Sequence, residues 1–208
     1  MLQTQYIHVP YGKTVHGEEE IEAVVNVLRT STQMGKHVRE MEERVAALYS
    51  KKYGIMVNSG SSALYLAADL MNYEPGSEII TPPLTFSTTV APLVKKGWVP
   101  AYVDVEEGTY NIDANKVEEM ITPKTNAMII PNLIGNLPNW KQLREIADKH
   151  NLFVFEDSCD TLGAEIDGAS SGRYTDMSAT SFYGSHIINC AGNGGMLCVN
   201  SDAFYNRG

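Results

Sequence analysis

The chain has 208 residues, of which 43% are hydrophobic and 20% charged, and its formal net charge at pH 7 is −9. A chain of this size can bury a core without disulfides or metals, while the negative charge argues against nucleic-acid binding, which requires clustered Lys and Arg. The three cysteines show no paired spacing, no apolar run could span a membrane, and the N-terminus lacks a signal-peptide pattern. We therefore expect a cytoplasmic protein.

The first part of the chain predicts an irregular arm followed by two helices. Residues 1–17 show no apolar period, and the acidic residues 18–20 suit the first turn of a helix. One helical face is predicted from the apolar stripe of Ile21, Val24, Val25 and Leu28. A second helix is predicted from the stripe of Val38, Met41, Val45 and Leu48.

From residue 54 onward, short apolar runs alternate with helical patterns. The predicted strands are 55–58, 78–81, 99–103, 127–131, 152–156, 177–183 and 195–199. The predicted helices are 60–71, 87–96, 113–121 and 138–150. Near-continuous apolar strands separated by helices are typical of a mostly parallel sheet covered on both faces. We therefore expect an α/β three-layer sandwich.

One segment could bind an anion, and a second could bind a planar ring. Asn-Ser-Gly-Ser-Ser-Ala at 58–63 lies between a predicted strand and helix, where unpaired N–H groups and the helix dipole favour a phosphate. Taken alone, this pattern is more often an ordinary capped turn. Phe86 follows the strand 78–81, where its ring could stack on a ligand or simply pack in the core.

Two further segments carry titratable groups. Asp157 lies at the carboxyl end of a predicted strand, where open α/β sheets bind ligands, and it could pair with a protonated ring nitrogen or cap the next turn. Residues 178–185 lead to a single histidine, His186, and the glycine-rich residues 192–195 follow. A lone histidine is more often structural than catalytic, so neither segment decides a function by itself.

The order of the motifs NSGSSA, PPLTFSTTV, FEDSCDTLGAEIDG, TSFYGSH and GNGG resembles the DegT/DnrJ/EryC1/StrS family of sugar-modifying enzymes that use pyridoxal phosphate (PLP). This resemblance runs from about residue 7 to the end. It implies an N-terminal arm at 1–17 and the large domain of a fold type I PLP-dependent transferase at 18–208. Family members continue into a smaller C-terminal domain. We expect that domain to be absent here, because the chain stops one turn after a helix cap at Ser201.

The resemblance also implies roles for individual residues. Gly60 and Ser61 would hold the cofactor phosphate, with a further hydrogen bond from Ser181. Phe86 would stack on the pyridine ring, and Asp157 would keep the pyridine nitrogen protonated. Asp160 is the sixth predicted cofactor-binding residue, and it stands where many aminotransferases of the family have His or Gln.

His186 stands where aminotransferases of the family carry the lysine that binds PLP covalently. An imidazole cannot form that bond, and the pattern resembles the NDP-4-keto-6-deoxyhexose 3-dehydrases, which use histidine with pyridoxamine phosphate (PMP). The resemblance implies C3 dehydration of a nucleotide-linked 4-keto-6-deoxyhexose in deoxysugar or lipopolysaccharide biosynthesis, with His186 as general base. It also implies a homodimer in the full-length enzyme and a second partner, either glutamate or a reductase.

Two other functions remain open at this point. The protein could be a PLP-dependent nucleotide-sugar aminotransferase whose lysine has been replaced, or a non-catalytic homologue that binds a sugar or PLP. Some of these dehydrases carry a 2Fe–2S cluster, and Cys159 falls where they place one ligand. Because a cluster needs four ligands and Cys190 and Cys198 do not match, we expect Cys159 to be a buried apolar residue and no metal site here.

Overall fold

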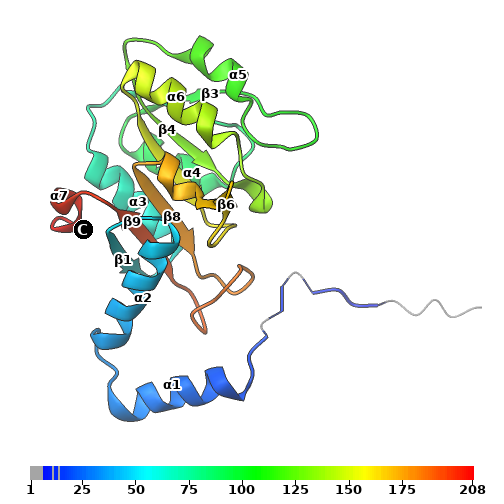
Figure 1. Cartoon of the computed structure of the whole chain (residues 1–208), viewed down its shortest axis with the longest axis vertical. Coiled ribbons are helices and arrows are strands. Elements are labelled where there is room, and N and C mark those ends of the chain that lie inside the picture. The colour runs from blue at the N-terminus through cyan, green and yellow to red at the C-terminus, as the bar shows by residue number, and fades with distance from the viewer. Residues whose placement is uncertain (1–6, 11, 14) are drawn as a thin grey trace, which may run out of the picture.

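A computed structural model describes residues 7–10, 12, 13 and 15–208. The described residues of the predicted arm form no regular structure, and positions 1–6, 11 and 14 of that arm lie outside the described residues. Helices α1 (Glu18–Thr30) and α2 (Lys36–Leu48) confirm the two helices predicted next (Figure 1). In α1 three acidic residues occupy the first turn, where they complement the helix dipole.

Helix α1 buries none of its residues, although its apolar stripe is continuous. Ile21, Val24 and Leu28 remain 48%, 46% and 65% exposed, and the helix lies apart from the sheet in Figure 1. Helix α2 differs, because it buries Val45 and Ala46 on the body of the protein. The helical period therefore predicted both helices correctly but did not determine what their apolar faces contact.

Seven strands form one mixed sheet: β1 (Tyr53–Val57), β2 (Glu78–Thr81), β3 (Val99–Tyr102), β4 (Thr125–Pro131), β5 (Phe153–Ser158), β8 (Met177–Ser181) and β9 (Gly195–Val199). Their order is β1-β9-β8-β5-β4-β2-β3. Neighbours from β3 to β8 pair in parallel, whereas β9 runs antiparallel to both β1 and β8. The mostly parallel sheet is confirmed.

Helices connect and cover the strands: α3 (Gly60–Met71), α4 (Ser87–Lys95), α5 (Ala114–Val117), α6 (Trp140–His150) and α7 (Asp202–Tyr205). The helix predicted over 113–121 is shorter than expected, because a 3₁₀ turn, η1 (Glu118–Met120), replaces its second half ahead of Pro123. The expected cap of α7 is present, since the Ser201 side chain accepts from the Phe204 N–H.

Four short elements of the described residues have no counterpart among the predicted ones. A two-stranded hairpin joins β6 (Glu165–Ile166) to β7 (Ala169–Ser170), and the 3₁₀ turns are η2 (Leu133–Gly135) and η3 (Ser171–Tyr174). Elements of two to four residues are too short to show an apolar period. The predicted strand 177–183 also ends earlier, at Ser181, where the chain turns into the loop that carries His186.

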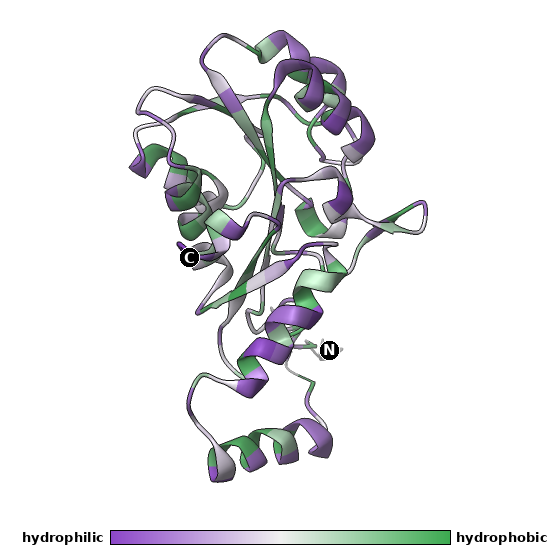
Figure 2. Ribbon diagram, turned by 60° about the vertical axis from the view of Figure 1, so that its left-hand side comes forward, coloured by the Kyte–Doolittle hydropathy of each residue, from purple (hydrophilic) through white to green (hydrophobic). Residues whose placement is uncertain are grey.

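Side chains alternate along the central strands and fill a core on each face of the sheet. Ile79 and Phe155 pack on the face covered by α3 and α4, whereas Ile80 and Val154 pack on the face covered by α5 and α6. Helix α2 packs beside β9 on the second face, which is the one that α5 and α6 cover. The expected three-layer α/β sandwich is confirmed, and Figure 2 shows hydrophobic residues along the central strands. Among the described residues, no helix is both long enough and apolar enough to cross a bilayer.

The second face also contains a buried polar network centred on Glu156 of β5. Asn132 donates to its Oε1 at 2.7 Å and Ser158 at 2.8 Å, while Ser178 donates to its Oε2 at 2.8 Å. These hydrogen bonds satisfy a carboxylate that burial would otherwise penalise. They also fix the end of β5, the strand that carries the adjacent Asp157.

Lys51, at the end of the α2–β1 connection, is buried near this network. Its ammonium group donates to the backbone oxygens of Gly172 and Thr175, and to the Thr175 hydroxyl at 3.2 Å. That hydroxyl in turn donates to Glu156 Oε2 at 3.5 Å. The lysine and the glutamate are thus linked through one threonine.

Candidate functional site

A cavity of about 790 Å³ opens at the carboxyl ends of β4, β5 and β8. It brings together all seven residues that the sequence predicted for the site: Gly60, Ser61, Phe86, Asp157, Asp160, Ser181 and His186. These residues come from four separate segments of the chain. A volume of this size suits a cofactor or a small substrate.

The floor of the cavity is the first turn of α3. Ser59 caps this helix by accepting from the Ser62 N–H at 3.1 Å. A Cβ atom at Gly60 would lie 2.6 Å from the Ser181 Cβ and 2.7 Å from the Cys159 Sγ, so only glycine fits there. A Cβ at Gly195 of β9 would lie 2.3 Å from the Ser59 carbonyl carbon. Two glycines therefore allow the helix N-terminus to approach the sheet, which creates a cradle suited to an anion.

Asp157 forms one wall and is 5% exposed. Thr89 donates to its Oδ2 at 2.7 Å, and the Cys159 N–H donates to its Oδ1 at 3.2 Å. Burial raises the pKa of the Asp157 carboxyl, and these two hydrogen bonds oppose that effect. No cation among the described residues pairs with Asp157. A buried carboxylate in this situation fits a ligand that brings a positive charge, such as a protonated pyridine nitrogen.

His186 lies in the loop after β8, on a turn in which its N–H donates to the Tyr183 carbonyl at 2.9 Å. Its Nε2 is 3.9 Å from Asp160 Oδ1, and its ring makes a T-shaped contact with the Tyr183 ring, with centroids 5.6 Å apart. Its Nδ1 is buried and has no hydrogen-bond partner within the described part of the chain. An imidazole that is held in a cavity with an unpaired ring nitrogen can accept or donate a proton.

The rim of the cavity is apolar. Phe86 is 71% exposed and Ile134 is 68% exposed, so Phe86 does not pack in the core and its ring is free to stack on a ligand. Ile134 has φ 50°, which is the left-handed region and is unusual for a β-branched residue. Its N–H donates to Asp160 Oδ2 at 3.0 Å, and this hydrogen bond holds the strained turn.

Sequence reasoning assigned no role to several other lining residues: Ser59, Leu64, Leu84, Thr85, Thr88, Thr89, Pro131, Leu133, Ile134, Tyr183, Asn193 and Gly194. Most of them lie inside the family motifs, next to residues that were predicted to bind the cofactor. One signal could have been used, because Thr85 and Thr89 stand four apart at a predicted helix start and would share one face.

Cys159 differs from expectation. It is only partly buried and lines the cavity, where its thiol lies next to Gly60. Burial raises the pKa of this thiol, and the carboxylate of Asp157 adds to the effect. The neutral thiol is therefore favoured at neutral pH, and Cys159 forms part of the wall beside the anion cradle.

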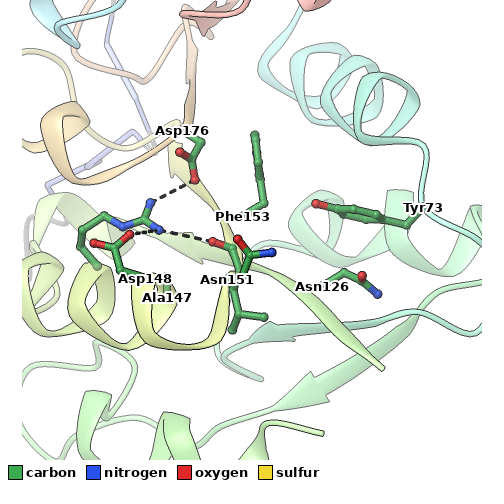
Figure 3. Close-up of a pocket in the computed structure, with 9 residues that line it drawn as sticks. Tyr73, Asn126, Ala147, Asp148, Asn151, Phe153 and Asp176 are labelled. Carbon is green, nitrogen blue, oxygen red and sulfur yellow. Dashed lines mark hydrogen bonds and ion pairs between the residues drawn. The ribbon is translucent and has the colours of Figure 1, made fainter. Parts of the chain in front are cut away.

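A second hollow, of about 450 Å³, lies at the opposite, amino ends of β4 and β5 (Figure 3). Arg144 lines it and pairs with Asp176 at 3.0 Å and Asp148 at 2.8 Å. Tyr73 also lines this hollow, and burial raises the pKa of its phenol to about 12. Because the charge of Arg144 is already balanced by two carboxylates, this hollow lacks the chemistry of the first cavity.

Comparison with known proteins gives a family match over almost the whole chain. The model of the DegT/DnrJ/EryC1/StrS aminotransferase family matches residues 14–207. A GDP-4-keto-6-deoxy-D-mannose 3-dehydratase of Yersinia pseudotuberculosis is 33% identical over 204 residues, which cover 94% of this chain and 51% of that protein. A UDP-2-acetamido-2-deoxy-3-oxo-D-glucuronate aminotransferase of Pseudomonas aeruginosa is 34% identical over 169 residues, which cover 81% and 47%.

Solved structures agree with this match. An E. coli GDP-4-keto-6-deoxy-D-mannose-3-dehydratase with bound hydrated PLP superposes with a TM-score of 0.90 at 29% identity, and covers 97% of this chain and 54% of that one. The chain thus spans about half the length of the relatives it matches. Both dehydratases and aminotransferases are among its relatives.

Proposed function

This chain belongs to the DegT/DnrJ/EryC1/StrS aminotransferase family, and from that premise we propose that it acts in PMP-dependent removal of the C3 hydroxyl group from a nucleotide-linked 4-keto-6-deoxyhexose. The observation that carries the proposal is the placement of His186. It lines the same cavity as Asp157 and the Gly60 cradle, in a family whose aminotransferases place a lysine at this motif position.

The described residues fit the cofactor. The cradle at Gly60 and Ser61 would hold the phosphate, with Ser181 beside it, because the N-terminus of α3 offers unpaired N–H groups to an anion there. Asp157 would hold the proton on the pyridine nitrogen, which supplies the cation that this buried carboxylate lacks. Phe86 would cover one face of the ring and exclude water from it.

When bound, PMP supplies an amine that reacts with the sugar's 4-keto group and a ring that accepts electrons. His186 would take the proton from the C4′ carbon of the cofactor, since the pKa of an unperturbed imidazole lies near the operating pH. Unlike lysine, His186 cannot bind the cofactor covalently, so its nitrogen remains available for proton transfer. The C3 hydroxyl group would leave as water once it has received a proton.

The test is mass spectrometry of the sugar product. PMP-loaded protein is mixed with a CDP- or GDP-4-keto-6-deoxyhexose, with and without glutamate as an amino donor to restore the cofactor. We expect the product to lose the C3 oxygen, and a His186→Asn variant to bind PMP but leave the sugar unchanged. Retention of the C3 oxygen by the wild-type protein would reject the proposal.

A second candidate, nucleotide-sugar amination, is supported by the aminotransferase among the relatives. The same mass spectrum separates the two reactions, because amination replaces the keto oxygen with an amine and keeps the C3 hydroxyl group. His186 argues against this candidate, since the exchange reaction of aminotransferases relies on a covalently bound lysine. A third outcome, PMP binding without turnover of any sugar, would indicate a non-catalytic homologue.

A further inference from the structure

A chain of hydroxyl groups leads from the start of α4 to Asp157. Thr89, in the first turn of α4, is 1% exposed, and its Oγ1 lies 2.7 Å from Asp157 Oδ2. Thr85, just before the helix, places its Oγ1 2.9 Å from Thr89 Oγ1. All three side chains line the cavity.

The ionised form of Asp157 fixes the direction of both hydrogen bonds. A carboxylate can only accept, so Thr89 must donate its one hydroxyl proton to Asp157. Thr89 then has no proton left for Thr85, and Thr85 must donate to Thr89. Each hydroxyl therefore strengthens the next, because a hydroxyl that accepts a hydrogen bond becomes a better donor.

This arrangement leaves about two of the roughly four lone-pair sites of the carboxylate without a donor. Thr89 of α4 donates a hydrogen bond to Oδ2, and the N–H of Cys159, which follows β5, donates one to Oδ1. The side chain is otherwise buried, so the cavity is where its remaining capacity can be used. Without the Thr89 hydroxyl, the buried carboxylate would lose one of these two hydrogen bonds, and the pKa of Asp157 would rise further.

We propose that Thr89 is a positioning residue that keeps the Asp157 carboxylate aimed at the cofactor's pyridine nitrogen, and that Thr85 acts through it. This inference rests on the proposed function, because it concerns the same cofactor. Neither threonine touches the reacting atoms. Both act by fixing the anion that holds the ring proton.

The test compares Thr89→Val, which keeps the shape but removes the hydroxyl, with Thr89→Ser, which keeps the hydroxyl. PMP affinity is measured by calorimetry, and the ultraviolet absorbance of bound PMP is followed against pH. Thr89→Val should weaken PMP binding about ten- to a hundred-fold, the range for a lost hydrogen bond to a charged group. It should also shift loss of the ring proton to lower pH, while Thr89→Ser should restore both measurements.

Two further variants keep the test decisive. In an Asp157→Asn background, Thr89→Val should change PMP affinity little, because the charged acceptor is gone. Thr85→Val should weaken PMP binding in the same way as Thr89→Val, but less. If Thr89→Val lowers the melting temperature, Thr85→Val takes its place in the test. An unchanged affinity and pH midpoint in Thr89→Val, or an equal loss in the Asn background, would overturn the inference.

The outcomes also separate this inference from the reaction proposed above. If the wild-type protein binds PMP and Thr89→Val binds it equally well, the positioning role is wrong while the reaction can still stand. If the Thr89 effects appear but no sugar loses its C3 oxygen, the reaction is wrong and the positioning role stands. Failure of the wild-type protein to bind PMP would reject both.

Discussion

His186 and Asp160 are neighbours in the lining of the cavity, with Nε2 and Oδ1 3.9 Å apart. The other oxygen of the same carboxylate accepts the Ile134 N–H at 3.0 Å. Asp160 therefore contacts the strained turn after β4 on one side and faces the histidine on the other. This position makes Asp160 a link between the cavity rim and the proposed base, rather than only a substitute for the His or Gln of other family members.

Replacing Asp160 should release the turn at Ile134. In Asp160→Ala the left-handed Ile134 loses the hydrogen bond that offsets its strain, so its amide should exchange with solvent much faster. Asp160→Asn retains a side-chain oxygen and should keep most of the protection. Hydrogen exchange measured by NMR or mass spectrometry checks this, and equal protection in Asp160→Ala and wild type would contradict it.

Replacing His186 with lysine should change how the cofactor is held. If His186 faces the reactive carbon of the cofactor, the lysine amine of His186→Lys can bond covalently to PLP and produce an absorbance band in the visible. A His186→Gln variant, which has no amine, is the control and should show no such band. Borohydride reduction followed by peptide mapping should locate the label at position 186; labelling elsewhere would place His186 away from the ring.

Gly60→Ala should impair both folding stability and phosphate binding. The added methyl group would meet Ser181 and Cys159 at less than 3 Å, and overpacking of this kind costs about 1–3 kcal/mol. Gly192→Ala is the matched control, because its Cβ would have 4.0 Å to the nearest atom. Urea unfolding and PMP titration measure the two effects. If Gly60→Ala unfolds in urea and binds PMP like the wild-type protein, the cradle has room for a methyl group and the prediction is wrong.

Asp157→Asn should stabilise the cofactor-free protein while it weakens cofactor binding. Burial raises the pKa of Asp157 above its unfolded value of 3.8, so its stability contribution is present at low pH and lost as the pH rises through the folded pKa. Asparagine imitates the neutral form. The gain should therefore appear in urea unfolding at neutral pH and fade near the unfolded pKa. Glu119→Gln removes an exposed carboxylate and should show no comparable gain.

Lys51 and Glu156 should depend on each other for stability. Lys51→Met alone removes the ammonium group that donates to Gly172 and Thr175, and buried acceptors left without a donor cost about 1–3 kcal/mol. Adding Glu156→Gln should recover part of the lost free energy of unfolding. The double variant should therefore lose less stability than the sum of the losses in the two single variants. Denaturant unfolding of all four proteins tests the coupling, and simple additivity would show that the bridging Thr175 does not connect the two charges.

Local patterns were enough to predict most of the elements. The bounds of α3 and of β2 and β9 agree with the predicted ones, because each has a clear apolar period or a Gly boundary. Short elements such as the hairpin of β6 and β7 could not be predicted, because two residues contain no period. The antiparallel direction of β9 was also beyond the sequence, since strand direction depends on where the preceding loop returns to the sheet.

The sequence by itself determined the α/β class, the family, and the seven candidate residues that line one cavity, because these follow from residue order and local period. Only the tertiary structure decided which groups surround them. Thr89 lies 68 positions before Asp157 and Asp160 lies 26 positions after Ile134, and no local pattern relates residues so far apart. Parallel strands bring them together, since their carboxyl ends meet at one edge of the sheet and place distant side chains around the same cavity.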